Sequence, residues 1–283
     1  MKPIKLYKGH LLLYIILAIC TVVAMISMKQ CRTEINPLKS YQRAEGDTIN
    51  VAIEISPISY SLATDTVGGF YYDLLRLISS KYNVKFKYHK FVSLNIAING
   101  LNDQIFDIIV GDFPSTTDIK ENFLHTEPVL VDKQVLVQRK GESVITDYLQ
   151  LSNDTIFVVE KSPFINRIHN LSREVGCDTI YVAEQNYSSE QLIMLTATGD
   201  IKQCVVNEYL AKSMIKDYPQ LDIKTKISFN QFQSWILSPH NADLCDRFNK
   251  WIIDIKNSVE YNELYKRYFQ SKEYKKRATL NRE

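Results

Sequence analysis

Residues 107–140 read D-I-I-V-G-D-F-P-S-T-T-D-I-K-E-N-F-L-H-T-E-P-V-L-V-D-K-Q-V-L-V-Q-R-K, and this stretch decides the fold of the chain. An apolar strand at 108–110 runs into a loop of small and polar residues, and a second long strand follows at 129–137. A crevice forms in this way at the carboxyl end of a parallel strand, with loop groups aimed into it. The stretch therefore predicts an α/β protein with a ligand crevice beside the loop.

Strand-like and helical runs alternate on both sides of this stretch. The first series has strands at 49–55, 84–88 and 106–110, with helices from about 69 and near 94–101. The second has strands at 156–159, 179–182 and 204–206 with helices at 163–175, 188–198 and 207–216, then strands at 223–227 and 232–237. Two amphipathic helices follow. Such alternation indicates right-handed β-α-β units and mainly parallel sheets.

Three blocks of sequence carry a resemblance to a known family. They are G-G-F-Y-Y-D-L-L-R-L-I at 68–78, the stretch at 107–140, and S-W-I-L-S at 234–238 with the helices that close on Y-K-R-Y-F at 265–269. Together they resemble the family 3 extracellular solute-binding proteins, with the strongest likeness to the non-catalytic binding module of membrane-bound lytic transglycosylase F. This implies a two-lobed, type 2 periplasmic-binding-protein architecture, with lobe 1 at 48–138 plus 229–270, lobe 2 at 139–228, and a ligand cleft between them.

The amino terminus indicates a membrane address. Residues 1–10 carry lysines, and residues 11–28 are uncharged, a run that as a helix reaches roughly 27 Å, close to the thickness of a bilayer core. We interpret 1–10 as cytoplasmic, 11–28 as an uncleaved transmembrane signal anchor and 29–47 as a linker. The bulk of the chain would then be periplasmic on a single-pass inner-membrane anchor, before a charged tail at 271–283. A lipoprotein lipidated at Cys20 and a cleaved secreted protein remain alternatives.

Composition excludes several classes of partner and cofactor. The net charge is only +2 and 45% of the residues are hydrophobic, so we expect no nucleic acid partner. The five cysteines form no C-x-x-C pair and no cluster with the histidines, so we expect no metal site and no cofactor.

The start of the helix expected at 163–175 is a candidate binding site. Ser162 is a favoured N-cap, Pro163 suits the first helical position, and Lys161 adds a positive charge beside them. The free N–H groups of such a helix suit a carboxylate or a similar anion.

The resemblance implies further cleft residues. The turn I-S-P-I-S-Y would contribute Ser56 and Tyr60, and the loop at 111–117 would contribute hydroxyls and a carboxylate. Lys120 lies nearest to the position of the family's carboxylate-gripping arginine, and Asn207 stands where the family commonly has an acid for the ligand's ammonium. These two departures leave a peptide or a cell-wall fragment as alternatives to an amino acid. The ligand-binding candidates are Ser56, Tyr60, Asp112, Ser115, Thr116, Lys120, Lys161, Ser162 and Asn207.

Enzyme signatures are absent from the sequence. It has no G-x-S-x-G, H-E-x-x-H, Walker loop or G-x-G-x-x-G, and the charged segment after Phe269 is too short for a lysozyme-like catalytic domain. We therefore expect a solute-binding protein without catalytic residues, serving an ABC permease, a cell-wall enzyme or a signalling partner. The alternatives are a ligand-independent interaction module of a cell-wall complex and, third, a glycan-cleaving enzyme that uses Glu160 or Glu208.

Overall fold

The computed structural model describes residues 17–18, 48–63, 66–114, 117–141, 144–151, 155–176, 180–184 and 186–270. Those from 48 onward belong to one compact unit, 43–283. The anchor expected at 11–28 lies outside the described residues, apart from Leu17 and Ala18. Within the described part, no helix combines the length and the apolar composition that a membrane crossing requires.

The first sheet is built on the apolar run I-N-V-A-I-E, which forms its second strand. The strand order is β4-β1-β5-β13-β6, and β7 also pairs with β13. The strands are β1 (Ile49–Glu54), β4 (Phe86–Phe91), β5 (Ile108–Pro114), β6 (Leu124–His125), β7 (Leu130–Asp132) and β13 (Gln231–Leu237). β1 is parallel to β4 and β5, whereas β13 is antiparallel to β5, β6 and β7. The carboxyl ends of β1 and β5 therefore meet at one edge of the sheet.

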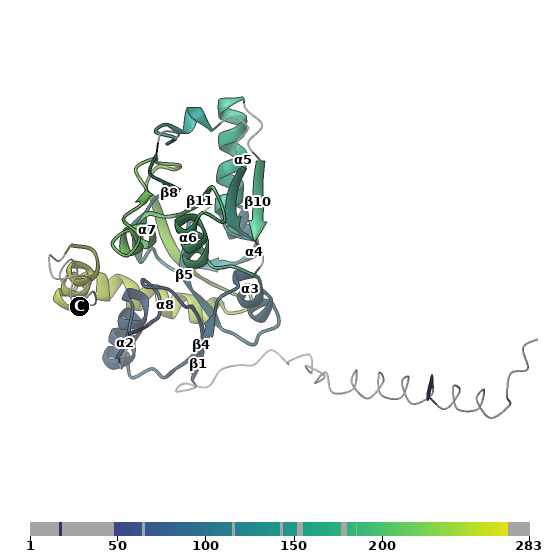
Figure 1. Cartoon of the computed structure of the whole chain (residues 1–283). Helices are drawn as coiled ribbons and strands as arrows, with labels where there is room; N and C mark the ends of the chain where they lie inside the picture. The colour runs from purple at the N-terminus through teal and green to yellow at the C-terminus, as the bar shows by residue number, and fades with distance from the viewer. Residues whose placement is uncertain are drawn as a thin grey trace, which may run out of the picture. The chain divides into compact units, whose positions relative to one another are not determined.

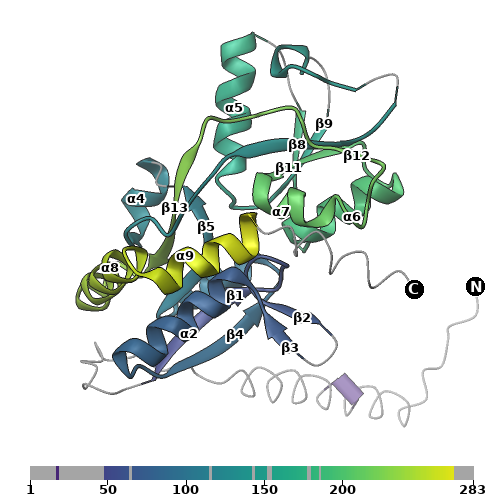
Figure 2. The ribbon, with the colours of Figure 1, turned by 90° about the vertical axis from the view of Figure 1, so that its left-hand side faces the viewer.

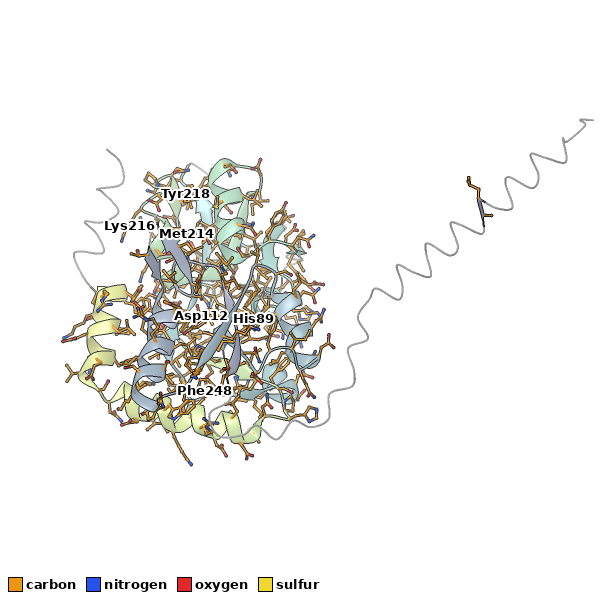
Figure 3. All side chains as sticks on the ribbon, turned by 90° about the horizontal axis from the view of Figure 1, so that it is seen from below. His89, Asp112, Met214, Lys216, Tyr218 and Phe248 are labelled. Carbon is orange, nitrogen blue, oxygen red and sulfur yellow. The ribbon has the colours of Figure 1, made fainter. Side chains whose placement is uncertain are left out.

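Amphipathic helices cover this sheet and form lobe 1 with it (Figure 1). They are α2 (Phe70–Tyr82), α3 (Leu94–Asn102), α4 (Thr117–Asn122), α8 (Ala242–Lys256), α9 (Val259–Tyr265) and a π-helical turn, η2 (Lys266–Gln270). A short hairpin, β2 (Ser61–Ala63) and β3 (Thr66–Gly68), precedes α2. Phe248 of α8 is 0% exposed and packs its ring 6.0 Å from that of Trp235, on the α8 side of the molecule (Figure 3).

The second sheet forms lobe 2 and has the order β10-β9-β11-β8-β12. Its strands are β8 (Gln134–Arg139), β9 (Thr155–Val159), β10 (Ile180–Glu184), β11 (Gln203–Asn207) and β12 (Leu221–Asp222). Its helices are α5 (Phe164–Val175), α6 (Ser189–Thr198) and α7 (Glu208–Met214), with a 3-10 turn, η1 (Tyr148–Gln150). β9 is parallel to β10 and β11, as the alternation predicts, but β8 runs antiparallel to β11 and β12.

The chain crosses between the sheets at Lys133 and returns between β12 and β13. The single strand expected at 129–137 is in fact two strands, because β7 belongs to the first sheet and β8 to the second. At the break, the buried carboxylate of Asp132 accepts hydrogen bonds from the N–H groups of Lys133 (2.8 Å) and Tyr209 (3.1 Å). The first crossing thus lies several residues before the lobe boundary expected at 138. The strand expected at 223–227 is reduced to one bridge, between Lys226 and Val135.

The last described turn connects lobe 1 back to lobe 2. α9 packs alongside α2, as Figure 2 shows, and η2 continues it. The hydroxyls of Tyr265 in α9 and Tyr209 in α7 are 2.9 Å apart, and the ring of Phe269 lies 4.2 Å from that of Tyr209. This lobe-bridging contact, made by Tyr209, Tyr265 and Phe269, links α7 to the tail of lobe 1.

Candidate functional site

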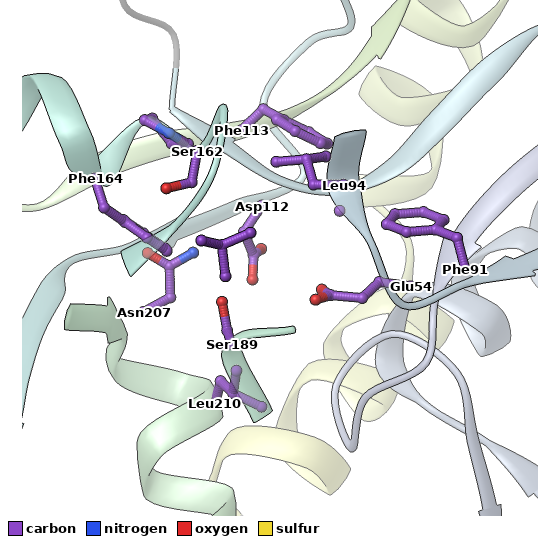
Figure 4. A pocket seen from close by; sticks show the side chains of 13 residues that line it. Glu54, Phe91, Leu94, Asp112, Phe113, Ser162, Phe164, Ser189, Asn207 and Leu210 are labelled. Carbon is purple, nitrogen blue, oxygen red and sulfur yellow. The ribbon is translucent and has the colours of Figure 1, made fainter. Parts of the chain in front are cut away.

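A pocket lies between the two lobes, where the carboxyl ends of the lobe 1 strands face the helix starts of lobe 2 (Figure 4). It encloses about 50 Å³. Pockets for drug-sized ligands hold roughly 300–1,000 Å³, so a large ligand requires the lobes to separate further. The lining residues are Glu54, Phe91, Leu94, Gly111, Asp112, Phe113, Val159, Ser162, Pro163, Phe164, Ser189, Asn207 and Leu210.

The lobe 1 wall of the pocket carries two half-buried carboxylates. Glu54 is the last residue of β1, and Asp112 lies in β5, so the parallel pairing of these strands brings both to the same edge. Asp112 accepts a hydrogen bond from the hydroxyl of Tyr71. Burial raises the pKa of Asp112 to about 6, although hydrogen bonds from Tyr71 and Asn207 act in the opposite direction. Burial also raises the pKa of Glu54 to about 8, and the charges of Asp112 and Glu190 add to the shift.

The polar side chains that lobe 2 contributes to the described lining of the pocket are uncharged. Ser162 precedes α5, Ser189 begins α6, and Asn207 ends β11 just before α7. Ser162 and Asn207 are only 6% and 5% exposed, and their Oγ and Oδ1 atoms have no hydrogen-bond partner among the described residues. A buried polar atom without a partner carries a desolvation cost that a ligand group can offset. Both atoms are therefore suited to ligand contact.

The helix start on this wall differs from the expected one. Ser162 was predicted to cap the helix, but the N-cap residue is Pro163, α5 begins at Phe164, and no side chain caps it. The prediction of a Ser162 cap is wrong by one residue. Lys161, at the turn before it, adopts a left-handed backbone with φ of 58°. Because Ser162 does not cap the helix, its hydroxyl remains unused at the pocket wall.

The structure brings together three of the predicted site residues: Asp112, Ser162 and Asn207 line the pocket. Lys120 and Lys161 are exposed and do not line it. Ser115 and Thr116 lie outside the described residues. A role in ligand contact remains a prediction for each of these residues.

The other two predicted residues, Ser56 and Tyr60, take part in local packing. The Ser56 hydroxyl accepts a hydrogen bond from the N–H of Ser59 (3.1 Å). The ring of Tyr60 packs edge-on to that of Tyr72 at 5.2 Å, with the ammonium of Lys90 5.6 Å from its centre. Neither lines the pocket as it stands, so ligand contact by these two is also still a prediction.

Sequence reasoning missed Glu54 and Ser189. The signal for Glu54 was present, because an acidic residue that ends an apolar parallel strand lies at the edge where ligands bind. Within the part of the chain that the structure describes, the lining of the pocket contains two acidic side chains and no lysine or arginine. Among the described residues, no group of three or more His, Cys, Asp or Glu side chains could hold a metal ion.

Two further acidic residues, Asp73 and Asp107, have structural partners instead of facing the pocket. Asp107 accepts a hydrogen bond from the N–H of Asn50 (2.7 Å), which ties β5 to β1. Asp73 accepts one from the hydroxyl of Tyr268 (2.7 Å), which ties α2 to η2.

The sequence of this chain matches a known protein family and is similar to several curated proteins. The family model of the bacterial extracellular solute-binding proteins, family 3, matches residues 48–271. The chain is 25% identical over 229 residues to the membrane-bound lytic murein transglycosylase F of Desulfosudis oleivorans, covering 78% of this chain and 48% of the relative. The protein of that name from Alteromonas mediterranea is 23% identical over 242 residues, covering 84% and 51%. This chain thus spans about half the length of these curated relatives.

Solved structures share the fold at low sequence identity. An ancestral arginine-binding protein bound to arginine superposes with a TM-score of 0.69 at 18% identity, covering 78% of this chain and 98% of that one. A putative binding component of an ABC transporter from Wolinella succinogenes, complexed with lysine, gives 0.68 at 20% identity, covering 82% and 100%. Both support a two-lobed α/β binding fold.

Proposed function

Because the chain belongs to the bacterial extracellular solute-binding proteins, family 3, we propose that it binds a small polar ligand in the pocket between its lobes. Glu54 and Asp112 would hold the ligand from lobe 1, and Ser162 and Asn207 from lobe 2. The ligand would be an amino acid, a peptide or a cell-wall fragment. This family assignment and the arginine and lysine in the related structures support the proposal.

One observation carries the proposal: the interlobe pocket contains two buried polar atoms, Ser162 Oγ and Asn207 Oδ1, that have no hydrogen-bond partner in the described part of the chain. A ligand that pairs with these atoms and with the lobe 1 carboxylates would contact both walls at once. Such a ligand has higher affinity for the closed arrangement than for an open one and shifts the population toward it. The hinge would be the two crossing segments, at Lys133 and between β12 and β13.

The cellular setting is also a proposal. Residues 11–28 would anchor the chain in the inner membrane, with the binding unit in the periplasm. A lipoprotein or secreted form is the alternative. An ABC permease or a cell-wall enzyme would respond to the closed state. No catalytic role is proposed, because the relatives named as transglycosylases match this chain over only about half of their length.

A second candidate function is a ligand-independent interaction module of a cell-wall complex. Exposed apolar side chains beside the return crossing favour it. Phe229 is 89% exposed, and Phe232, 61% exposed, pairs across the strands with Val131, which is 43% exposed. Contiguous apolar side chains on a surface are a common feature of contact sites between proteins.

Thermal unfolding of the full chain in detergent tests the two functions. The probes are amino acids, short peptides and a soluble digest of peptidoglycan. We expect at least one probe to raise Tm, and Ser162→Ala to reduce that shift, because the mutation removes a ligand contact. Ser80→Ala, which alters an exposed serine of α2, is the matched control and should leave the shift unchanged. No shift with any probe, from a folded protein, would favour the interaction module.

A further inference from the structure

We propose that the ligand of this pocket carries a cationic nitrogen, seated between Glu54 and Asp112, and that it carries no carboxylate. The inference rests on the proposed function and names the chemical class of its ligand. A small amine without a carboxylate fits this description better than a free amino acid does.

The charges of the lining support this class. Glu54 and Asp112 reach the pocket from neighbouring parallel strands, and Figure 4 shows both carboxylates directed toward its centre. Among the described residues, no lysine or arginine lines the pocket. A ligand carboxylate enclosed here would lie near the charged Asp112 and the protonated Glu54 without a compensating cation, and the poorly hydrated surroundings would strengthen the repulsion from Asp112. An ammonium in the same place would neutralise that charge.

The hydrogen-bonding groups of the walls point to the same class. Asn207 lowers the pKa of Asp112, and its Oδ1 is an acceptor without a partner among the described residues. Once Glu54 has released its proton, the two carboxylates, Asn207 Oδ1 and Ser162 Oγ, which has no partner among the described residues, can all act as acceptors. An ammonium carries three donors, and a guanidinium carries five or so, which match a wall of acceptors.

Apolar side chains enclose the rest of the space. Phe91, Leu94 and Phe113 from lobe 1 and Phe164 and Leu210 from lobe 2 line the pocket. They exclude water from around the carboxylates, which makes an unpaired carboxylate costly and a cation a better partner. The raised pKa of Glu54 has the same physical origin. Binding of a cation at neutral pH would therefore release a proton from Glu54.

Titration calorimetry with pairs of probes that differ in a carboxylate tests the proposed ligand class. The full chain in detergent is titrated with L-alaninamide, L-alanine and N-acetyl-L-alanine, and with agmatine and L-arginine, its carboxylated counterpart. We expect the amines without a carboxylate to bind at least tenfold more tightly than their zwitterionic counterparts, and N-acetyl-L-alanine not to bind. Tighter binding of the zwitterions, or no detectable binding of any cationic probe, would overturn the inference.

These titrations distinguish an error in the proposed ligand class from an error in the proposed binding function. If only neutral or anionic probes bind, the cationic ligand is excluded but the receptor function stands. If no probe binds, and a soluble digest of peptidoglycan also fails to bind, both fail.

Two variants and a control assign the effect to the carboxylates. Glu54→Gln and Asp112→Asn should each weaken agmatine binding at least tenfold, whereas Glu121→Gln, an exposed glutamate of α4, should leave it unchanged. Titrations in buffers of different ionisation enthalpy measure proton release. We expect close to one proton released by the wild type at pH 7 and almost none by Glu54→Gln. Equal proton release by both proteins would exclude Glu54 as the cation's partner.

Discussion

The two lobes contribute different chemistry to the same pocket. Lobe 1 presents carboxylates at the ends of parallel strands, Glu54 and Asp112, whereas lobe 2 presents neutral groups at helix starts, Ser162, Ser189 and Asn207. The charge of the site is thus set by one wall, while the other supplies uncharged hydrogen-bonding groups. Substitutions on one lobe alone can therefore change the charge of the ligand that a two-lobed binding protein accepts.

The largest expected effect on the free energy of unfolding comes from a core substitution in lobe 1, which we compare with a core substitution in lobe 2. Phe248→Ala should lower the free energy of unfolding by about 3–5 kcal/mol, because it leaves a cavity beside Trp235 in a core that contains residues of both sheets. Leu171→Ala, in a smaller core cluster of lobe 2, should cost less. Urea denaturation measures both. Ile253→Ala, 51% exposed on the same helix, is the control. A larger cost for Leu171→Ala would reverse this part of the comparison.

Two glycines with positive φ, one in each lobe, extend the comparison of the lobes to the backbone. Gly69, before α2 in lobe 1, has φ of +124°, and an added Cβ would lie 2.4 Å from the carbonyl oxygen of Ser59. Gly176, after α5 in lobe 2, has φ of +67° and no atom within 4 Å of that position. Gly69→Ala should therefore cost about 3 kcal/mol and Gly176→Ala about 1 kcal/mol in chemical denaturation. Equal costs would show that the turn before α2 adjusts freely.

The pH dependence of stability tests the charged wall. Glu54 keeps its proton up to about pH 8 in the folded protein but loses it near its ordinary pKa of 4.5 when unfolded. Between these values the folded state binds more protons, so the free energy of unfolding falls as pH rises. Glu54→Gln removes this loss and should stabilise the protein by about 2 kcal/mol at pH 9, with no gain near pH 4.

The matched variant for that experiment lies on the opposite lobe. Burial also raises the pKa of Glu190, so Glu190→Gln should show the same sign with a smaller size. Denaturation curves from pH 4 to 9 measure both variants. A gain from Glu54→Gln that does not grow with pH would contradict the burial of its charge.

The smallest effect concerns the contact that joins the lobes. Tyr209→Phe and Tyr265→Phe each remove the bond between their hydroxyls, and each should cost about 1 kcal/mol or less. Because both changes remove the same interaction, the double variant should cost little more than either single one. Strictly additive costs in this double-mutant cycle would show that the two hydroxyls act independently.

Much of the fold could be predicted from local pattern. The stripe of Phe70, Leu74 and Ile78 predicted α2, and the apolar run at 204–206 predicted β11, because periodic burial leaves a direct trace in the sequence. The split between β7 and β8 left only a weak trace, the polar run Asp132-Lys133-Gln134 between two apolar halves. It depends on Asp132 accepting the N–H of Tyr209, which is 77 positions away.

The candidate site was predictable only in part for the same reason. Asp112, Ser162 and Asn207 follow strands of an α/β pattern, so strand ends alone suggest them. Ser162 was expected to cap a helix, and only the folded backbone shows that its hydroxyl is left without that partner. The charge of the pocket depends on Glu54 and Asp112 lying on neighbouring strands at the same edge of the sheet, an arrangement of distant parts of the chain that periodicity does not predict.

The lobe-bridging contact makes η2, at the end of the described residues, a natural reporter of occupancy. If the lobes separate, the gap between α7 and η2 must widen, because Phe269 rests on Tyr209. A pair of dyes, one on α7 and one just after Gln270, would convert that displacement into an optical signal. Whatever lies beyond Gln270 would then experience each binding event as a mechanical change at its point of attachment.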